Sequence, residues 1–268
     1  MKLSRIAFLA SAAVLALWLL AGCAGNNPDG SSGRADLQTE SDEPEARKRA
    51  RIRLELAVGY FEQGKTTVAL DEIKLAIAAD PTMPDAYNVR GLIYQRLADA
   101  QLAEESFRRA LALRPNDGGV IHNLAFLHCQ NARYPQAEQA FGQALAAPGY
   151  TGRAKTYMVL ALCQEKAGKP REAEDNLQRS YDIEPGNPIV GYNLAKMLHQ
   201  RGETVRAQFI VRRVNNSEFA NAETLWLGIK VENRMNNRVA AEQLAAQLKK
   251  RFPQSREMSA YDRGAFNE

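Results

Sequence analysis

The stretch Pro84–Asn116, PDAYNVRGLIYQRLADAQLAEESFRRALALRPN, decides how this chain folds. A small residue, Gly91, lies near the middle of its first half. Its second half carries Ala103, Phe107 and Ala110 at the spacing of three or four residues that places side chains on one face of a helix. The stretch therefore predicts two helices joined by a short turn.

The same pattern recurs about six times, and such fixed-period self-similarity indicates a repeat architecture. The alanine that opens the second half returns at steps of 34, 34, 36, 34 and 33 residues. A small residue also recurs in each first half, because two helices can approach closely only where a small side chain lies at their crossing point. The aligned alanines are Ala69, Ala103, Ala137, Ala173, Ala207 and Ala240, and the small residues are Ala57, Gly91, Ala125, Ala161, Ala195 and Gly228.

The pattern resembles the tetratricopeptide repeat family over about residues 50–253. The resemblance implies an all-α fold, a right-handed superhelical solenoid of six helix-turn-helix repeats whose first helices line a groove. An insertion near 147–152 predicts a longer loop, and the polar run at 215–217 predicts a shortened helix in the fifth repeat. We expect a repeat domain at 46–253, with repeats at about 50–83, 84–117, 118–153, 154–187, 188–220 and 221–253, and then a loose C-terminal tail at 254–268.

The N-terminus has the pattern of a bacterial lipoprotein signal. Two basic residues precede an apolar run at 6–20, which is too short for a typical membrane span. The run ends in the tetrapeptide LAGC, which resembles a lipobox and predicts a signal peptide at 1–22 with lipidation of Cys23. An ordinary cleaved signal and an uncleaved anchor are the alternatives.

The residues after Cys23 indicate where the protein is located and that a linker follows the lipidated cysteine. Ala24, rather than aspartate, follows the cysteine. By resemblance to Gram-negative lipoproteins, this implies that the lipid anchor lies in the outer membrane and that the protein faces the periplasm. Residues 23–45 are rich in Gly, Ser, Asn, Asp, Pro and Glu, a composition that predicts a lipidated flexible tether.

Two further cysteines, Cys129 and Cys163, form an even pair in what would be an oxidising compartment. In the register of the repeats they lie on the first helices of the third and fourth repeats, and such neighbouring helices are about 8–10 Å apart. We therefore predict a disulfide between them. Two separate buried thiols are the alternative.

The family register also assigns residues to the groove. In the first four repeats these residues are mostly apolar, and an exposed apolar strip commonly marks a partner site for a helix or an extended peptide. The alternative is that they pack against neighbouring helices. The predicted groove residues are Leu54, Val58, Phe61, Leu92, Gln95, Phe126, Met158 and Leu162, and the same register adds His122, Lys196, His199, Leu225, Ile229 and Glu232.

Charge and motifs argue against several function classes. The formal net charge is +4 and falls near +2 without the signal peptide, which is too weak a balance to indicate nucleic-acid binding. The chain has no CxxC, HExxH, GxSxG or phosphate-loop motif. We therefore expect no enzyme, no cofactor, no metal site and no small-molecule substrate.

The order of parts, with phrases such as Asn88–Leu92 and His122–Ala125, resembles the type IV pilus biogenesis and stability lipoproteins (PilW/PilF). This resemblance implies a pilotin that binds the secretin subunit of the pilus machinery, helps it to reach the outer membrane and multimerise, and supports pilus stability. Two alternatives are a lipid-anchored repeat scaffold of outer-membrane β-barrel assembly and a regulator of peptidoglycan enzymes.

Overall fold

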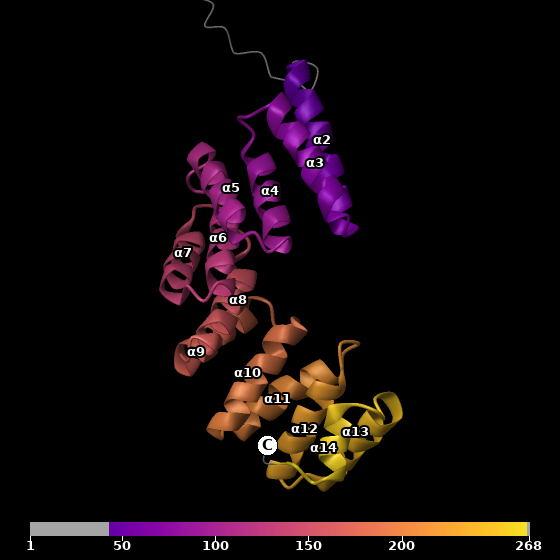
Figure 1. Ribbon diagram of the computed structural model, residues 1–268. Coiled ribbons are helices and arrows are strands. Elements are labelled where there is room, and N and C mark those ends of the chain that lie inside the picture. Colours follow the sequence, from indigo (N-terminus) through magenta and orange to yellow (C-terminus); the bar gives the residue numbers. More distant parts are fainter. Residues whose placement is uncertain (1–42, 267–268) are drawn as a thin grey trace, which may run out of the picture. The chain divides into compact units, whose positions relative to one another are not determined.

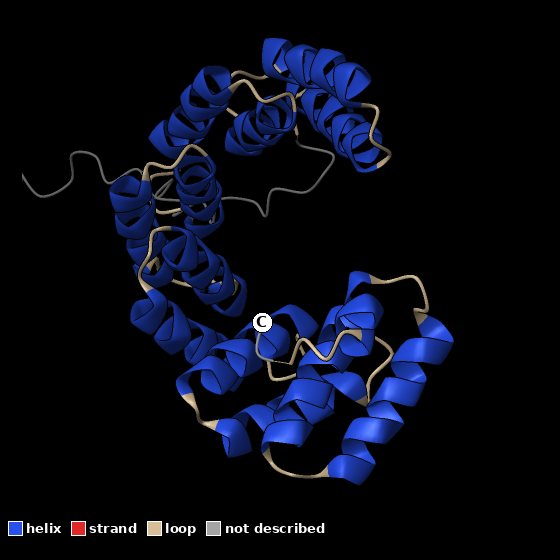
Figure 2. Cartoon of the chain, turned by 60° about the horizontal axis from the view of Figure 1, so that its bottom comes forward, coloured by secondary structure: helices blue, strands red, loops and turns tan. Residues whose placement is uncertain are grey.

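The computed structural model describes residues 43–266, and every regular element in that range is a helix (Figure 2). This confirms the predicted all-α repeat fold. The chain divides into one unit at 1–45 and a second at 46–268. The predicted signal peptide, Cys23 and the tether up to residue 42 lie outside the described residues. No helix within 43–266 has both the length and the hydrophobicity needed to cross a bilayer.

Within residues 43–266, six antiparallel helix pairs follow one another and are followed by one short helix (Figure 1). The first helix begins earlier than the predicted first repeat, and the loop at 147–152 is longer than most other loops between pairs. The pairs are α2 (Glu45–Glu62) with α3 (Thr66–Ala79), α4 (Pro84–Arg96) with α5 (Ala100–Leu113), α6 (Gly118–Gln130) with α7 (Tyr134–Ala146), α8 (Arg153–Lys166) with α9 (Pro170–Ile183), α10 (Pro188–Arg201) with α11 (Thr204–Asn215), and α12 (Ala222–Arg234) with α13 (Arg238–Arg251); α14 spans Arg256–Asp262.

The turn inside each pair ends the first helix in the same way. Each turn places one residue in the left-handed region of backbone conformation, at positions 64, 98, 132, 168, 202 and 236. Glycine occupies three of these positions, whereas Ala98, Ala132 and Asn236 occupy the others at φ values of 59°, 55° and 57°. A left-handed residue is a common helix terminator, so the turn recurs with the period of the sequence.

The small residues do lie at the helix crossings. A Cβ atom added to Gly91 would come within 2.5 Å of the Phe107 ring, so α4 and α5 could not keep their present separation. Ala57, Ala125 and Ala161 occupy the equivalent position in other repeats and are fully buried. The recurring small residue therefore sets the distance between the two helices of a pair.

The hydrophobic core runs from one repeat into the next. In the first such cluster, Ala57 of α2 and Ile73 of α3 are buried together with Ala86 and Ile93 of α4. Each first helix therefore completes the core of the pair before it, as expected when a single repeat cannot bury its own apolar face.

The predicted loose tail is wrong for residues 256–262, which form α14. Ser255 caps this helix by accepting a hydrogen bond from the Met258 amide at 3.1 Å, and Met258 is buried against the last pair. Tyr261 and Phe266 pack edge to face with each other and both lie against Trp226 of α12. Helix α14 begins where the first helix of another repeat would begin, and it covers apolar surface that a seventh repeat would otherwise cover.

Candidate protein-binding face

Successive first helices lie side by side and are joined by polar contacts about one repeat apart. Gln95 Nε2 of α4 donates to Gln130 Oε1 of α6 at 2.6 Å. Asn123 Nδ2 of α6 donates to Asn88 Oδ1 of α4 at 3.0 Å. Similar contacts continue from α6 to α8, α8 to α10 and α10 to α12. We call the surface that these helices form the first-helix face.

The eight predicted groove residues are distributed along this face, and none of them is fully buried. Phe126 of α6 is 38% exposed, and the other seven are half-buried. Leu54 and Phe61 also pack against the core of the first two repeats, and Met158 packs against that of the fourth and fifth. Apart from Gln95, these residues form an apolar strip along the first-helix face, and Phe126 is the most exposed member of the strip.

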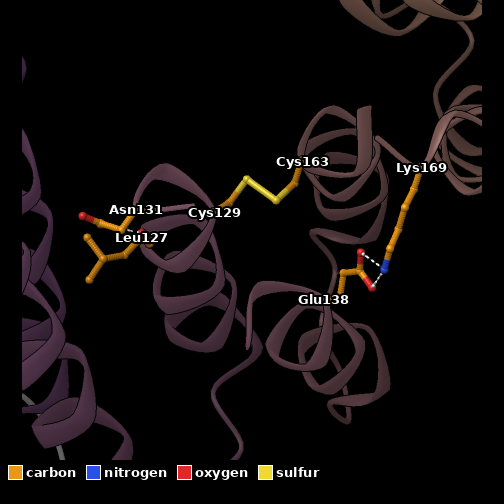
Figure 3. The surroundings of a disulfide bond; sticks show 6 residues. All are labelled: Leu127, Cys129, Asn131, Glu138, Cys163 and Lys169. Atoms are coloured by element: carbon orange, nitrogen blue, oxygen red, sulfur yellow. Dashed lines mark hydrogen bonds and ion pairs between the residues drawn. A yellow bond between two sulfur atoms is a disulfide. The ribbon is translucent and has the colours of Figure 1, made fainter. Parts of the chain in front are cut away.

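The Cys129–Cys163 pair is joined in a disulfide that connects α6 with α8, with Cα atoms 5.9 Å apart (Figure 3). Both residues are buried. The bond therefore fixes the spacing of the two first helices beside Phe126 and Leu162.

A second set of links joins the same repeats and was not foreseen from the sequence. Lys169 Nζ, just before α9, lies 2.8 Å from both carboxylate oxygens of Glu138 on α7 (Figure 3). Arg133 and Glu104 make the equivalent pair one repeat earlier, at 2.8 Å. The only sequence signal is a glutamate directly after the aligned alanine, which is too common on a helix surface to assign a partner.

The structure corrects the assignment of His122 to the groove. The ring is buried between the third and fourth repeats, where Nδ1 lies 2.8 Å from Thr156 Oγ1 and the ring packs edge to face with Phe141. Burial, reinforced by the nearby positive charge of Lys155, lowers the pKa of His122 to about 4. The residue is therefore a neutral contact between repeats at neutral pH.

The assignment of the sixth repeat to the groove was also wrong. Leu225 and Ile229 are fully buried in the cluster that includes Met258 of α14. Glu232 is buried as well, and it accepts hydrogen bonds from Gln208 and Arg212 of α11 at 2.6–3.0 Å. Burial alone would raise the pKa of Glu232, but the bonds from Arg212 and Gln208 lower it below its ordinary value. The repeat register of the other helix pairs gives no sign of α14, whose Met258 packs with Leu225 and Ile229.

The sequence also missed the most exposed apolar residues of α2. Ile52 and Leu56 are 49% and 41% exposed, and with Gly59 and Tyr60 they line a shallow hollow of about 360 Å³. The equivalent residues of α4 include Ala86 and Ile93, which are buried against the preceding pair. Among the described residues, no helix pair precedes α2 to cover this surface.

Within residues 43–266, no three His, Cys, Asp or Glu side chains are grouped as metal ligands would be.

Family models for the tetratricopeptide repeat match residues 84–117, 118–184 and 165–225. The chain is a tetratricopeptide repeat protein. The matched residues together cover the second to the fifth helix pair, and the helix pairs outside them repeat the same geometry.

Two pilus proteins of this family are similar to the chain over most of its length. The type IV pilus assembly protein PilF of Pseudomonas aeruginosa is 26% identical over 231 residues, which cover 86% of this chain and 90% of PilF. The solved structure of PilF superposes with a TM-score of 0.74 at 25% identity, over 82% of this chain and all of the solved chain. The crystal structure of PilW, a type IV pilus biogenesis factor, superposes with a TM-score of 0.68 at 29% identity, over 79% and 97% of the two chains. This tetratricopeptide repeat protein is homologous to PilF.

Proposed function

We propose that this protein is a tetratricopeptide scaffold of type IV pilus biogenesis. The observation that carries the proposal is the similarity to PilF across nearly the whole of both chains. The matched region includes the repeats that form the first-helix face, and not only an isolated repeat.

The finer role that we propose is that of an outer-membrane lipoprotein acting as a pilotin. Lipid chains on Cys23 would hold the protein at the outer membrane, since two or three acyl chains anchor a protein durably. The first-helix face would bind an amphipathic segment of the secretin subunit. Binding and anchoring together bring the secretin to the membrane in which it multimerises, and no bond-making step is required.

Phe126 is the residue best suited to test the binding step. Its ring is partly exposed on α6, three residues from the disulfide that holds α6 against α8. Replacing it with aspartate places a charge in the middle of the apolar strip without opening a fully buried core. Phe209 on α11 provides the matched control, because it is a phenylalanine that is 68% exposed on a second helix.

The experiment compares a strain lacking this protein with strains complemented by wild type, Cys23→Ser, Phe126→Asp and Phe209→Asp. We expect secretin multimers and surface pili to be lost without the protein and restored by wild type and Phe209→Asp. Phe126→Asp should be lipidated and folded yet fail to restore multimers, and Cys23→Ser should be folded but absent from the outer-membrane fraction.

Two results would overturn parts of the proposal. Normal secretin multimers and pili in the strain lacking the protein would remove the role in pilus biogenesis. Full rescue by Phe126→Asp would remove the first-helix face as the binding surface. Co-purification with a β-barrel insertion subunit or a cell-wall enzyme, in place of the secretin, would support one of the two alternative functions.

A further inference from the structure

Helix α2 carries a stripe of residues on the side that faces away from α4. The members of the stripe recur at steps of four, three and four residues, a spacing that lines up side chains along one face of a helix. They are Ile52, Leu56, Gly59 and Gln63. Leu56 lies about 200° around the helix from Leu54, so the stripe is opposite to the groove residues of this helix. We call this surface the open face of α2.

The open face has the position of a surface on which helices stack. Counted from the small residue at each helix crossing, the equivalents of Ile52 and Gly59 are buried in the second to fifth repeats, most of them in a cluster with the preceding helix pair. These equivalents are Ala86, Val120, Thr156 and Val190 for Ile52, and Ile93, Leu127, Cys163 and Met197 for Gly59. In α2 no described helix pair covers the same positions (Figure 1). The open face is therefore suited to bind a helix.

Gly59 leaves room for such a helix. A Cβ atom added to Gly59 would have no other atom within 4 Å, whereas one added to Gly91 would collide with Phe107. The hollow of about 360 Å³ on α2 is centred on the same residues, with Ile52 and Leu56 as its apolar lining. A second helix backbone can approach closely at a glycine that is flanked by apolar side chains.

The order of residues along α2 matches a second copy of the same helix. Ile52 and Leu56 lie two residues on either side of the centre of the stripe, and Arg49 and Gly59 lie five residues on either side. When two copies lie antiparallel about this centre, Ile52 of each meets Leu56 of the other. The long side chain of each Arg49 then passes over Gly59 of the other copy and comes within about one turn of its Glu62.

Charge also favours the antiparallel direction. Arg49 and Glu62 are both exposed, so an antiparallel pair brings opposite charges together at each end, whereas a parallel pair would bring like charges together. The charges nearest the centre are already compensated within each copy. Arg53 is paired with Glu72 at 2.7 Å, and Arg51 with Glu55 at 3.4 Å.

We infer that the open face of α2 binds the open face of a second copy of this protein, with the two α2 helices antiparallel. The occupant is a second copy because α2 itself supplies both the apolar stripe and the charges that complement it. The open face and the first-helix face lie on opposite sides of α2, so the inference does not depend on the pilus role or the partner proposed above.

Sedimentation of the purified full-length protein in a mild detergent tests the contact. Every variant carries Cys23→Ser, so that acyl chains do not cause association. We expect a reversible equilibrium between monomer and dimer, which Leu56→Asp should weaken about tenfold or more because it places a charge at the centre of the interface. Leu75→Asp on α3 is the matched control, since Leu75 is 49% exposed and Leu56 is 41% exposed. This control should leave the equilibrium unchanged.

Two further measurements test the antiparallel register. Arg49→Glu and Glu62→Arg should each weaken the dimer, and the two changes in one chain should restore it because they exchange the charges. When two differently tagged copies are oxidised together, Gly59→Cys should cross-link to Arg49→Cys. Gly59→Cys should not cross-link to itself, because these positions would lie about 15 Å apart along the helices.

Several results overturn the inference. A wild-type protein that stays monomeric at every concentration would exclude self-association, and a dimer that survives Leu56→Asp or is weakened equally by Leu75→Asp would place the contact elsewhere. Cross-linking of Gly59→Cys mainly to itself would show a parallel pair. A monomer in which Leu56→Cys resists a thiol reagent would show that the same chain covers the open face. If Leu56→Asp does not fold by circular dichroism, the charge exchange at Arg49 and Glu62 decides the question.

Discussion

The guanidinium carbon of Arg96 lies 4.1 Å from the centre of the Phe61 ring, and Nη1 of the same side chain donates a hydrogen bond to the Phe61 carbonyl oxygen at 3.1 Å. The two residues belong to the first helices of the first and second repeats. Phe61, predicted to be open to a partner, is therefore covered on one side by a cation. This lowers its value as a binding residue and gives it a role in joining the repeats.

A double-mutant cycle tests that role. We expect Arg96→Ala and Phe61→Leu to show a coupling of about 0.5–1 kcal/mol in urea unfolding, in the direction of mutual stabilisation. Because Phe61→Leu keeps the backbone carbonyl, the hydrogen bond cancels from the cycle. Arg108→Ala should be additive with Phe61→Leu, and a coupling of the same size for that pair would rule out stacking as the cause.

A glycine pair tests the helix crossing. Gly91→Ala forces a methyl group against Phe107, and overpacking of this kind destabilises by about 1–3 kcal/mol. Gly142 lies in α7 with no atom within 4 Å of an added Cβ, so Gly142→Ala should raise stability by up to about 1 kcal/mol through helix propensity. Thermal unfolding of the two variants should shift in opposite directions. A stabilised Gly91→Ala protein would show that the crossing tolerates a larger residue.

The disulfide makes a third prediction. Closing a loop with a sequence separation of 34 residues stabilises a fold by about 4 kcal/mol in the chain-entropy model. Reductant should therefore lower the thermal midpoint of the wild-type protein. Reductant should leave the thermal midpoint of the Cys129→Ser, Cys163→Ser double variant unchanged. Because this variant keeps Cys23, it also controls for any effect of reductant on that residue. A wild-type midpoint that does not respond to reductant would contradict the bond.

Acid should weaken the contact between the third and fourth repeats. The folded pKa of His122, about 4, lies below its unfolded value of about 6.5, so folding favours the neutral ring. The stabilisation is complete above pH 6.5 and is lost as pH falls toward 4, by up to about 3 kcal/mol. His122→Gln should be less stable at pH 7 but should lose less stability across this interval. Parallel pH profiles for the two proteins would exclude His122 as the titrating group.

The sequence predicted most of the fold because small residues recur at the same position of each repeat, where the two helices of a pair cross. Gly91 and the aligned alanines mark positions where helices touch. The need for a small side chain at such a position depends only on the two helices of the pair. The pairing of Cys129 with Cys163 followed from the same register, since it places both residues on neighbouring first helices.

The errors arose where a residue depends on what lies beyond its own repeat. His122 and Glu232 occupy groove positions in the register, but Thr156 and Phe141 enclose the first and Arg212 bonds the second. Ile52 and Leu56 were missed because they lack a neighbour rather than gain one. The register treats all repeats alike, so it does not show that no described helix pair covers α2. Helix α14 carries too few residues to show a repeat period.

The two ends of the described array are therefore unlike, and this restricts how copies of the protein could assemble. A chain of copies joined end to end needs a different and open surface at each end. Helix α14 covers the apolar surface of the last helix pair. The exposed side of α2 therefore cannot pack against that surface on another molecule. Two copies that met through α2 would use the same surface on both sides, and that arrangement is complete with two subunits and cannot grow into a filament.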